Sequence, residues 1–234
     1  MERNIRIIRA HKEEIINMES YSENNFVKLG GVVASELELS HEIYGEKFFK
    51  FFMEIDRLSG VKDRIPVIIS ERLIDTQDFS IGKLVLVEGQ YRSYNQVLDS
   101  GKSKLILSVF VKEITTEDLD EKIKTVNELV LIGCICKPPI YRKTPLGRDI
   151  ADVLVAVNRA YNKSDYIPCI LWGRNAKFCQ SLGIGTNVRL EGRIQAREYE
   201  KKYEDGTVET RVAYEVSVSK FEEFKGEEVE DAQE

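Results

Sequence analysis

The stretch "DYIPCILWGRN" at residues 165–175 joins an indole ring to a guanidinium group. It contains Trp172, the only tryptophan of the 234 residues, followed directly by Gly173 and Arg174. An apolar run of this length predicts a strand. A flat ring beside a cation suits the stacking of a base and the neutralisation of a phosphate along a single nucleic-acid strand.

Side chains alternate along a strand, so this run has two faces. The predicted core face is Ile167, Cys169 and Leu171. The predicted outer face is Tyr166, Ile170, Trp172 and Arg174. In the stretch around residue 195, Ile194 and Ala196 are expected to point inward, and Arg193, Gln195, Arg197 and Tyr199 outward. Both outer faces mix aromatic rings with arginine, which favours base stacking; the alternative is that Trp172 and Tyr199 pack on each other or beneath a loop.

The elements that would hold these residues occur twice in the chain. Three blocks recur in the same order at an offset of 102 or 103 residues. They are "NFVKLGGVV" at 25–33 with "NELVLIGCI" at 127–135, "DRIPVIISERL" at 63–73 with "DYIPCILWGRN" at 165–175, and "IGKLVLVEGQ" at 81–90 with "IGTNVRLEGR" at 184–193. We therefore expect two homologous domains.

The second repeat predicts three strands, a short helix over "RNAKFCQSLGIG" that Gly183 ends, and a long hairpin. Asp205-Gly206 marks the hairpin turn. This order fits an all-β chain with short helices, built as two tandem OB-folds, each a five-stranded Greek-key barrel. A small sandwich is the alternative fold, although it would not need the helix. The expected divisions are an N-terminal extension at 1–24, a diverged first domain at 25–115, a linker at 116–126, a second domain at 127–221 and an acidic disordered tail at 222–234.

The second repeat resembles the bacterial single-stranded DNA-binding protein family over about 95 residues. The motifs that carry the resemblance are "NELVLIG", "ADVLVAVNRAY", "CILWGRNAKF" and "RLEGRIQAREY". It implies that the DNA-stacking rings are Tyr161, Tyr166, Trp172 and Tyr199. Because the family assembles four OB domains, it also implies a homodimer of this two-domain chain.

Charge separates the two repeats. Residues 127–221 hold 15 Lys and Arg against 11 Asp and Glu, whereas residues 1–126 hold 18 against 22 and the last 13 residues hold 1 against 7. A basic domain inside an acidic chain indicates a phosphate-binding surface. The expected phosphate-binding residues are Arg142, Lys143, Arg148, Arg159, Arg174, Arg193, Arg197, Lys201 and Lys202.

The first repeat has lost the matching rings. Ser59, Arg64 and Ser70 stand where the second repeat has Tyr161, Tyr166 and Trp172, and Tyr91 and Tyr94 are the aromatic residues near its fourth strand. We therefore expect the second repeat to make most of the contact with nucleic acid.

The expected function is sequence-tolerant binding and protection of single-stranded DNA during replication, recombination or repair. The alternatives are a protein-interaction module of a primosome or a mobile-element complex with weak nucleic-acid binding, and RNA as a ligand, because stacking and phosphate contacts serve both polymers. Nothing indicates an enzyme, a metal site or a cofactor. We expect a cytoplasmic, nucleoid-associated protein without a membrane span. Replication proteins are candidate partners, although the apolar tip that the family carries at its C-terminus is absent.

Overall fold

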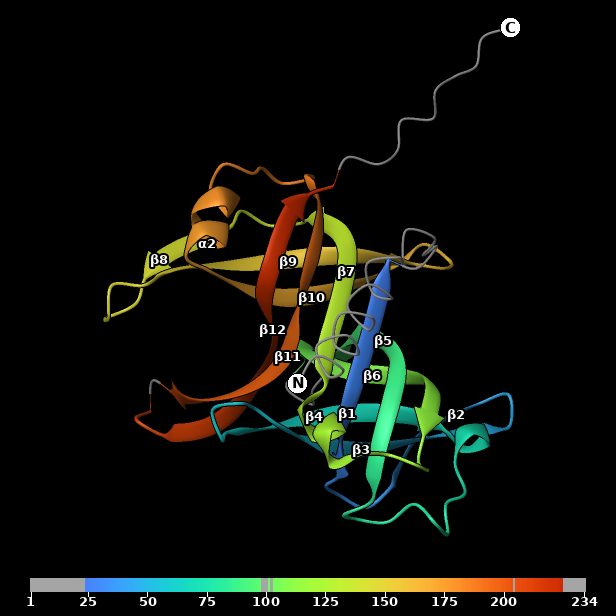
Figure 1. The fold of residues 1–234 in the computed structure, drawn as a ribbon. Helices are drawn as coiled ribbons and strands as arrows, with labels where there is room; N and C mark the ends of the chain where they lie inside the picture. The colour runs from blue at the N-terminus through green and yellow to red at the C-terminus, as the bar shows by residue number, and fades with distance from the viewer. Residues whose placement is uncertain (1–23, 98–100, 102, 204, 225–234) are drawn as a thin grey trace, which may run out of the picture.

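The computed structural model describes residues 24–97, 101, 103–203 and 205–224, which form two β barrels joined side by side (Figure 1). The first repeat comprises β1 (Asn25–Val33), β2 (Glu38–Ile43), β3 (Glu46–Asp56), β4 (Lys62–Ser70), the 3₁₀ helix η2 (Glu71–Leu73), β5 (Leu84–Val97) and β6 (Ser103–Thr115). A 3₁₀ helix η3 (Glu121–Thr125) connects it to the second repeat. The second comprises β7 (Asn127–Ile135), β8 (Ile140–Lys143), β9 (Asp149–Arg159), β10 (Lys163–Trp172), the helix α2 (Arg174–Cys179), β11 (Asn187–Lys202) and β12 (Val208–Glu223).

The two repeats have the same topology. In each one the fourth strand runs parallel to the sixth, and the first strand pairs with both the third and the fifth strand, which closes the barrel. This confirms the predicted all-β chain of tandem OB-folds. The edge strands β2 and β8 are additions to the five expected strands of each repeat, and both are short and mostly exposed.

Closure of each barrel depends on a glycine in its first strand. A Cβ atom on Gly31 would lie 2.3 Å from the Glu54 carbonyl oxygen, and one on Gly133 would lie 2.3 Å from the Ala156 carbonyl oxygen. Real side chains do not approach a backbone atom so closely, so only glycine lets these strands bend from one partner to the other. The two positions are 102 residues apart, as the repeat predicts.

Strand alternation places the core as expected. Ile167, Cys169 and Leu171 of β10 are buried, and so is Ile194 of β11, whereas Ala196 is only partly buried. Tyr166 and Trp172 stay open on the opposite face of β10. On these two strands, the alternation of side chains therefore predicts which residues fill the barrel interior.

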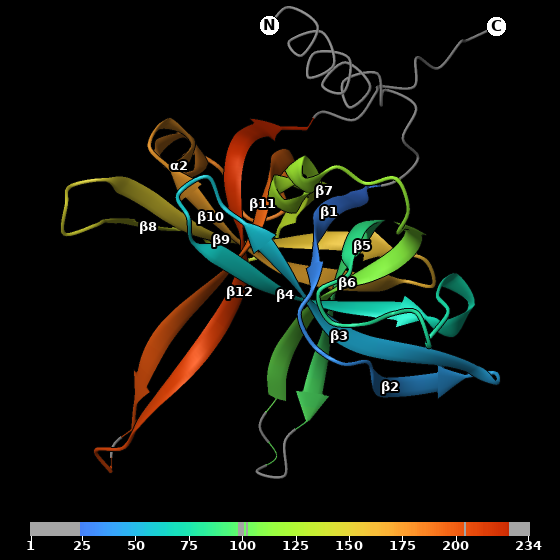
Figure 2. The same cartoon turned by 60° about the horizontal axis from the view of Figure 1, so that its bottom comes forward.

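The predicted helix and hairpin both form, with local differences. The helix α2 ends at Cys179, before the predicted stop at Gly183, and η2 takes its place in the first repeat. The hairpin β11–β12 turns at Asp205-Gly206, but its last strand pair joins Lys202 to Val208, so the loop is longer than two residues. Gly206 has a φ of +83° and donates its N–H to the Tyr203 carbonyl oxygen at 3.0 Å. In Figure 2 this hairpin and the β5–β6 hairpin extend from the two barrels toward the same side.

The repeats are joined by antiparallel pairing of β1 with β7, which makes one continuous twelve-stranded sheet. Lys28 lies opposite Glu128 near the centre of this seam. The connecting η3 packs against β1, where Gly30 donates its N–H to the Val126 carbonyl oxygen at 2.9 Å. Strand β12 continues to Glu223, and the expected N-terminal extension and most of the expected tail lie outside the described residues.

Two buried aspartates make matching contacts across the repeats. Asp63 of β4 accepts the N–H of Ala196 on β11 at 2.8 Å, and Asp165 of β10 accepts the N–H of Ser93 on β5 at 2.7 Å. Asp63 and Asp165 are 102 residues apart, and Ser93 and Ala196 are 103 apart, as in the repeat blocks. The two barrels of the chain are therefore related by an approximate twofold axis.

Candidate nucleic-acid interface

The outer face of the second repeat runs across β8, β9, β10, β12 and β11. Trp172 of β10 lies directly opposite Ile150 of β9, and Ile150 lies opposite Arg142 of β8. Residues paired in this way share one face of a sheet, so the indole and the Arg142 guanidinium belong to the same surface. This face carries both groups that single-strand binding requires, a ring and a cation.

Trp172 is held at one edge and open elsewhere. Its Nε1–H donates to the Ser217 hydroxyl oxygen on β12 at 3.3 Å, and the residue is 40% exposed. Ile170, which lies on the same face, is buried. The outer face is therefore exposed to solvent at some residues, such as Trp172, and covered at others. The arrangement presents the indole with its polar N–H already satisfied by the protein.

Gly173 explains why the strand stops at the tryptophan. Its φ of +56° is a left-handed conformation that glycine adopts without steric cost, and α2 begins at the next residue. Arg174 is therefore the first residue of a helix and does not continue the outer face of β10, which corrects the assignment made from strand alternation. Arg174 is exposed beside that face.

The other three predicted rings lie at separate places on the second repeat. Tyr161 is 94% exposed in the turn between β9 and β10, with a φ of +62°, and Tyr166 is 42% exposed on β10. Tyr199 is 37% exposed on the projecting part of β11, where the Arg197 guanidinium carbon lies 5.8 Å from its ring centroid. All four rings can therefore be reached from solvent, from three different elements.

The predicted cations divide into two groups. Lys143, Arg148, Lys201 and Lys202 are exposed like Arg174, and the Lys201 Nζ lies 5.0 Å from the Tyr203 ring centroid. The remaining four form ion pairs within the described residues. They are Arg142 with Asp152 at 2.9 Å, Arg159 with Asp165 at 3.3 Å, Arg193 with Asp63 at 3.3 Å, and Arg197 with Glu215 at 3.0 Å.

Arg193 has a structural role that the sequence did not reveal. It reaches across the repeats to Asp63, and its other terminal nitrogen donates to the Gln195 side-chain oxygen at 3.1 Å. Burial lowers the pKa of Arg193 from its ordinary value, and the positive charge of Arg57 adds to this effect, whereas Asp63 opposes it. Arg193 thus faces outward from its own barrel and is partly covered by the neighbouring one.

Arg197 is fixed by an acid on its own hairpin. The Glu215 carboxylate accepts from Nε and from a terminal nitrogen, at 3.0 and 3.3 Å, and this hydrogen bonding raises the pKa of Arg197. Glu215 also accepts from the Gln195 side-chain amide at 2.8 Å. Part of the charge of Arg197 is therefore balanced within the protein.

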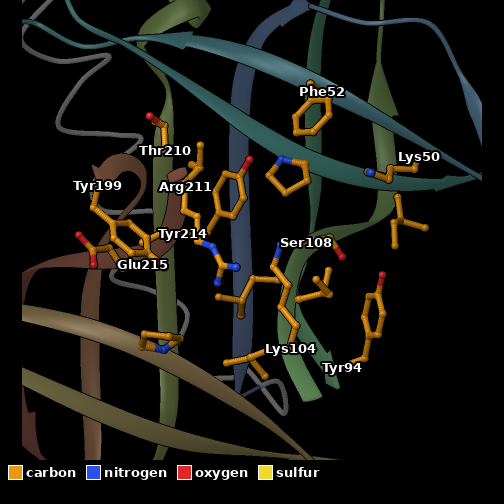
Figure 3. Close-up of a pocket in the computed structure, with 18 of the residues that line it drawn as sticks. Lys50, Phe52, Tyr94, Lys104, Ser108, Tyr199, Thr210, Arg211, Tyr214 and Glu215 are labelled. Atoms are coloured by element: carbon orange, nitrogen blue, oxygen red, sulfur yellow. The ribbon is translucent and has the colours of Figure 1, made fainter. Parts of the chain in front are cut away.

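A cavity of about 570 Å³ lies where the outer faces of the two repeats meet. Its walls include matched residues from the two halves, such as Pro66 with Pro168. Tyr199 and Tyr214 line it from the second repeat and Tyr94 from the first (Figure 3). Burial raises the pKa of Tyr214. Tyr199, on the β11–β12 hairpin, thus also lines a cavity that both repeats form.

The first repeat carries rings that were overlooked in the sequence. The Phe52 ring has the Arg64 guanidinium carbon at 4.7 Å and the Lys50 Nζ at 5.4 Å from its centroid. The run "KFFKFF" at 47–52, with aromatic residues and lysine interleaved, was the available signal. Tyr91, in contrast, is fully buried, and burial raises its pKa well above the usual value, so it cannot receive a base.

Metal-ligating side chains do not gather in the described part of the chain. No group of three or more His, Cys, Asp or Glu residues in it could hold a metal ion. None of its helices has the length and apolar character needed to cross a membrane.

Comparison with known proteins identifies the family. The model of the single-strand binding protein family matches residues 126–224. Single-stranded DNA-binding protein B of Bacillus subtilis (strain 168) is 36% identical over 86 residues, which cover 32% of this chain and 74% of that protein. Single-stranded DNA-binding protein 1 of Staphylococcus aureus (strain COL) is 35% identical over 83 residues, covering 32% of this chain and half of that protein.

The fold of the whole chain also has a solved counterpart. The crystal structure of the wild-type single-stranded DNA-binding protein from Thermus aquaticus covers 86% of this chain and 93% of its own, with a TM-score of 0.68. Its sequence identity is 19%, so this likeness concerns the fold alone. The family model matches the second repeat, whose outer face holds Trp172, and the structural counterpart covers 86% of the chain. From its sequence, the chain belongs to the single-strand binding protein family.

Proposed function

We propose that this protein binds and protects single-stranded DNA without sequence preference, mainly through the outer face of its second repeat. The observation that carries the proposal is Trp172, whose N–H is bonded to Ser217 while the residue stays open on a face that also holds Arg142. Every base has a π face, so stacking on such a ring accepts any sequence.

The rings and the exposed cations have separate parts in this proposal. Tyr161, Tyr166, Trp172 and Tyr199 stack bases, and Lys143, Arg148, Arg174, Lys201 and Lys202 neutralise phosphates. Arg142, Arg159 and Arg197 contribute less charge because carboxylates already pair with them. Arg193 mainly joins the repeats.

The proposed biological setting follows the family. Binding of this kind serves replication, recombination or repair of DNA in the cytoplasm, at the nucleoid. We further propose domains at 25–115 and 127–221, and a homodimer that presents four OB domains. Light scattering should give twice the 26.9 kDa of one chain, and the mass of a single chain at micromolar concentration would contradict the dimer.

The function is tested by titrating labelled oligo-dT, oligo-rU and duplex DNA of equal length with the protein and following fluorescence anisotropy. We expect oligo-dT to bind far more tightly than the duplex, because stacked and paired bases do not expose their faces. Equal affinity for the duplex would overturn the proposal, and no binding of either DNA would overturn it in favour of a protein-interaction module. The oligo-rU arm measures how far the site distinguishes DNA from RNA.

A further inference from the structure

The outer face of the first repeat holds a continuous array of flat groups, here called the β2–β6 array: His41, Phe48, Phe110 and Arg92. The Arg92 guanidinium carbon lies 3.9 Å from the Phe110 ring centroid, and the Phe110 and Phe48 centroids are 5.6 Å apart. His41 stacks on Phe48 with centroids 4.8 Å apart and only 5° between the ring planes. The array crosses the sheet from its edge strand β2 to β5.

The β2–β6 array occupies the place that Trp172 holds in the second repeat. Ser70 is the counterpart of Trp172, and Phe48 lies opposite it as Ile150 lies opposite Trp172. On the next strand Ile68 pairs with Phe110, as Ile170 pairs with the small Ser217. The large and small side chains have therefore been exchanged between neighbouring strands.

Because of this exchange the first repeat keeps an aromatic surface, although its residues at the positions that match the rings of the second repeat are not aromatic. In the second repeat β10 supplies the ring (Trp172) and β12 the serine (Ser217). In the first repeat β4 supplies the serine (Ser70) and β6 the ring (Phe110). Ser70 is buried and donates its hydroxyl to Glu46, so it leaves the space above it to the two phenylalanine rings. The aromatic ring of the first repeat therefore lies one strand away from the position that matches Trp172.

A second cavity, of about 450 Å³, opens over the β2–β6 array. All four members line it, together with Tyr94 and, from the second repeat, Arg159. Its volume is within the range of pockets that enclose small planar ligands. Tyr94 also lines the larger cavity between the repeats, so the two spaces adjoin along one side chain.

The charge of this cavity favours an anionic strand over an acidic or neutral partner. Arg92 lines it, and so does Arg159, which is paired with Asp165 at 3.3 Å. The described lining residues include no Asp or Glu, whereas the larger cavity is lined by Glu209 and Glu215. Arg92 is oriented by two hydrogen bonds to the Gln90 side-chain oxygen, at 2.9 and 3.2 Å. Aromatic rings beside an oriented guanidinium match what a nucleotide requires.

We propose that this cavity is a second base-binding site, in which a nucleobase of the bound single strand stacks against the β2–β6 array while Arg92 faces its phosphates. The proposal rests on the proposed function, because it needs the strand that the second repeat holds. It assigns the first repeat a direct contact at residues outside the set matched to Tyr161, Tyr166 and Trp172.

Tryptophan fluorescence tests the second base-binding site when the indole is placed in the first repeat. The double variant Phe110→Trp with Trp172→Phe carries its only tryptophan in the β2–β6 array, and oligo-dT at saturation should quench its fluorescence. A matched control, Ile81→Trp with Trp172→Phe, places the indole on an exposed loop that lines neither cavity, and its emission should not change. An unquenched indole at position 110, in a protein that still binds oligo-dT by anisotropy, would overturn the proposal.

A second variant tests the site even if the substitution at position 110 prevents folding. His41→Ala removes a ring from the edge strand β2, and we expect it to weaken oligo-dT binding about fivefold or more, with the urea midpoint and the quenching of Trp172 unchanged. Unchanged affinity in His41→Ala would count against the site. Failure of the wild-type protein to bind oligo-dT would instead overturn the proposed function, so the two failures are distinguishable.

Discussion

The indole N–H of Trp172 donates to the hydroxyl oxygen of Ser217, 3.3 Å away on the neighbouring strand. The bond joins β10 to β12 on the outer face and limits the motion of a side chain that is 40% exposed. A ring that is already ordered loses less conformational entropy when a ligand packs on it. The relationship therefore supports a prepared stacking site rather than a tryptophan left at the surface by chance.

Removing this ring should weaken binding without unfolding the protein. We expect Trp172→Ala to reduce the affinity for oligo-dT by about 1–3 kcal/mol, the value of one stacked base. Trp172→Phe keeps a ring but loses the bond to Ser217, so its loss should be smaller. Isothermal titration of both variants and the wild type checks this order, and an alanine variant that binds like the wild type would refute it.

The contact between the repeats should depend strongly on Asp63. Its carboxylate is 1% exposed and accepts from Arg57 at 2.6 Å, from Arg193 at 3.3 Å and from the Ala196 N–H at 2.8 Å. Asp63→Ala would leave two arginines facing an apolar methyl group, so we expect a loss of about 3–5 kcal/mol in the free energy of unfolding.

Urea denaturation measures this loss. Asp56→Ala is the matched control, because its carboxylate is exposed and its ion pair with Lys62 spans 3.8 Å. The control should change stability by less than about 1 kcal/mol. If the two variants unfold at the same urea concentration, the Asp63 contacts do not hold the repeats together.

Single-strand affinity should fall steeply with salt. Each phosphate that a protein cation neutralises on a single strand contributes about −0.7 to the slope of log affinity against log salt concentration. Lys201→Ala should make the slope less negative by up to that amount, whereas Arg193→Lys, which alters a residue bound to Asp63, should leave it nearly unchanged. A slope near zero in the wild type would rule out phosphate neutralisation.

Acid should destabilise the edge of the second barrel through Asp149. The Tyr141 hydroxyl donates to this carboxylate and Lys177 lies 3.2 Å from it, and together they lower the pKa of Asp149 below its usual value of 3.8. A carboxyl group whose pKa is lower in the folded than in the unfolded protein stabilises the fold above the unfolded value. That stabilisation is lost as the pH falls through the folded value.

The urea midpoint of Asp149→Asn should therefore depend less on pH than that of the wild type between about pH 2 and 5. The two curves should converge at the acid end, where the wild-type carboxylate is protonated. Parallel curves over this range would show that Asp149 has the same pKa in both states.

Much of the fold could be predicted because it depends on local patterns that occur twice. Alternation in β10 correctly assigned Ile167, Cys169 and Leu171 to the core, although it carried the outer face one residue pair too far, to Arg174, which begins α2. The edge strand β8 was missed because it has only four residues, three of them exposed, and so shows no period of its own.

The candidate site was less predictable, because contacts between repeats decide it. Strand alternation gives the direction of Arg193 correctly but cannot reveal that Asp63, 130 residues earlier, pairs with it. Matching the repeats position by position shows Ser70 as a lost ring, although Phe110 on the next strand supplies one. An exchange of side chains between strands becomes visible only when the pairing of those strands is known.

The fluorescence of Trp172, the single tryptophan of the chain, reports directly whether a base stacks on it. Oligo-dT is added to the wild-type protein until anisotropy shows saturation, and the emission is compared with that of a sample that received duplex DNA. We expect strong quenching by oligo-dT, following the same binding curve as the anisotropy, and little change with the duplex. Unchanged emission at saturation with oligo-dT would show that the bound strand does not contact the indole, and base stacking on Trp172 would then be wrong.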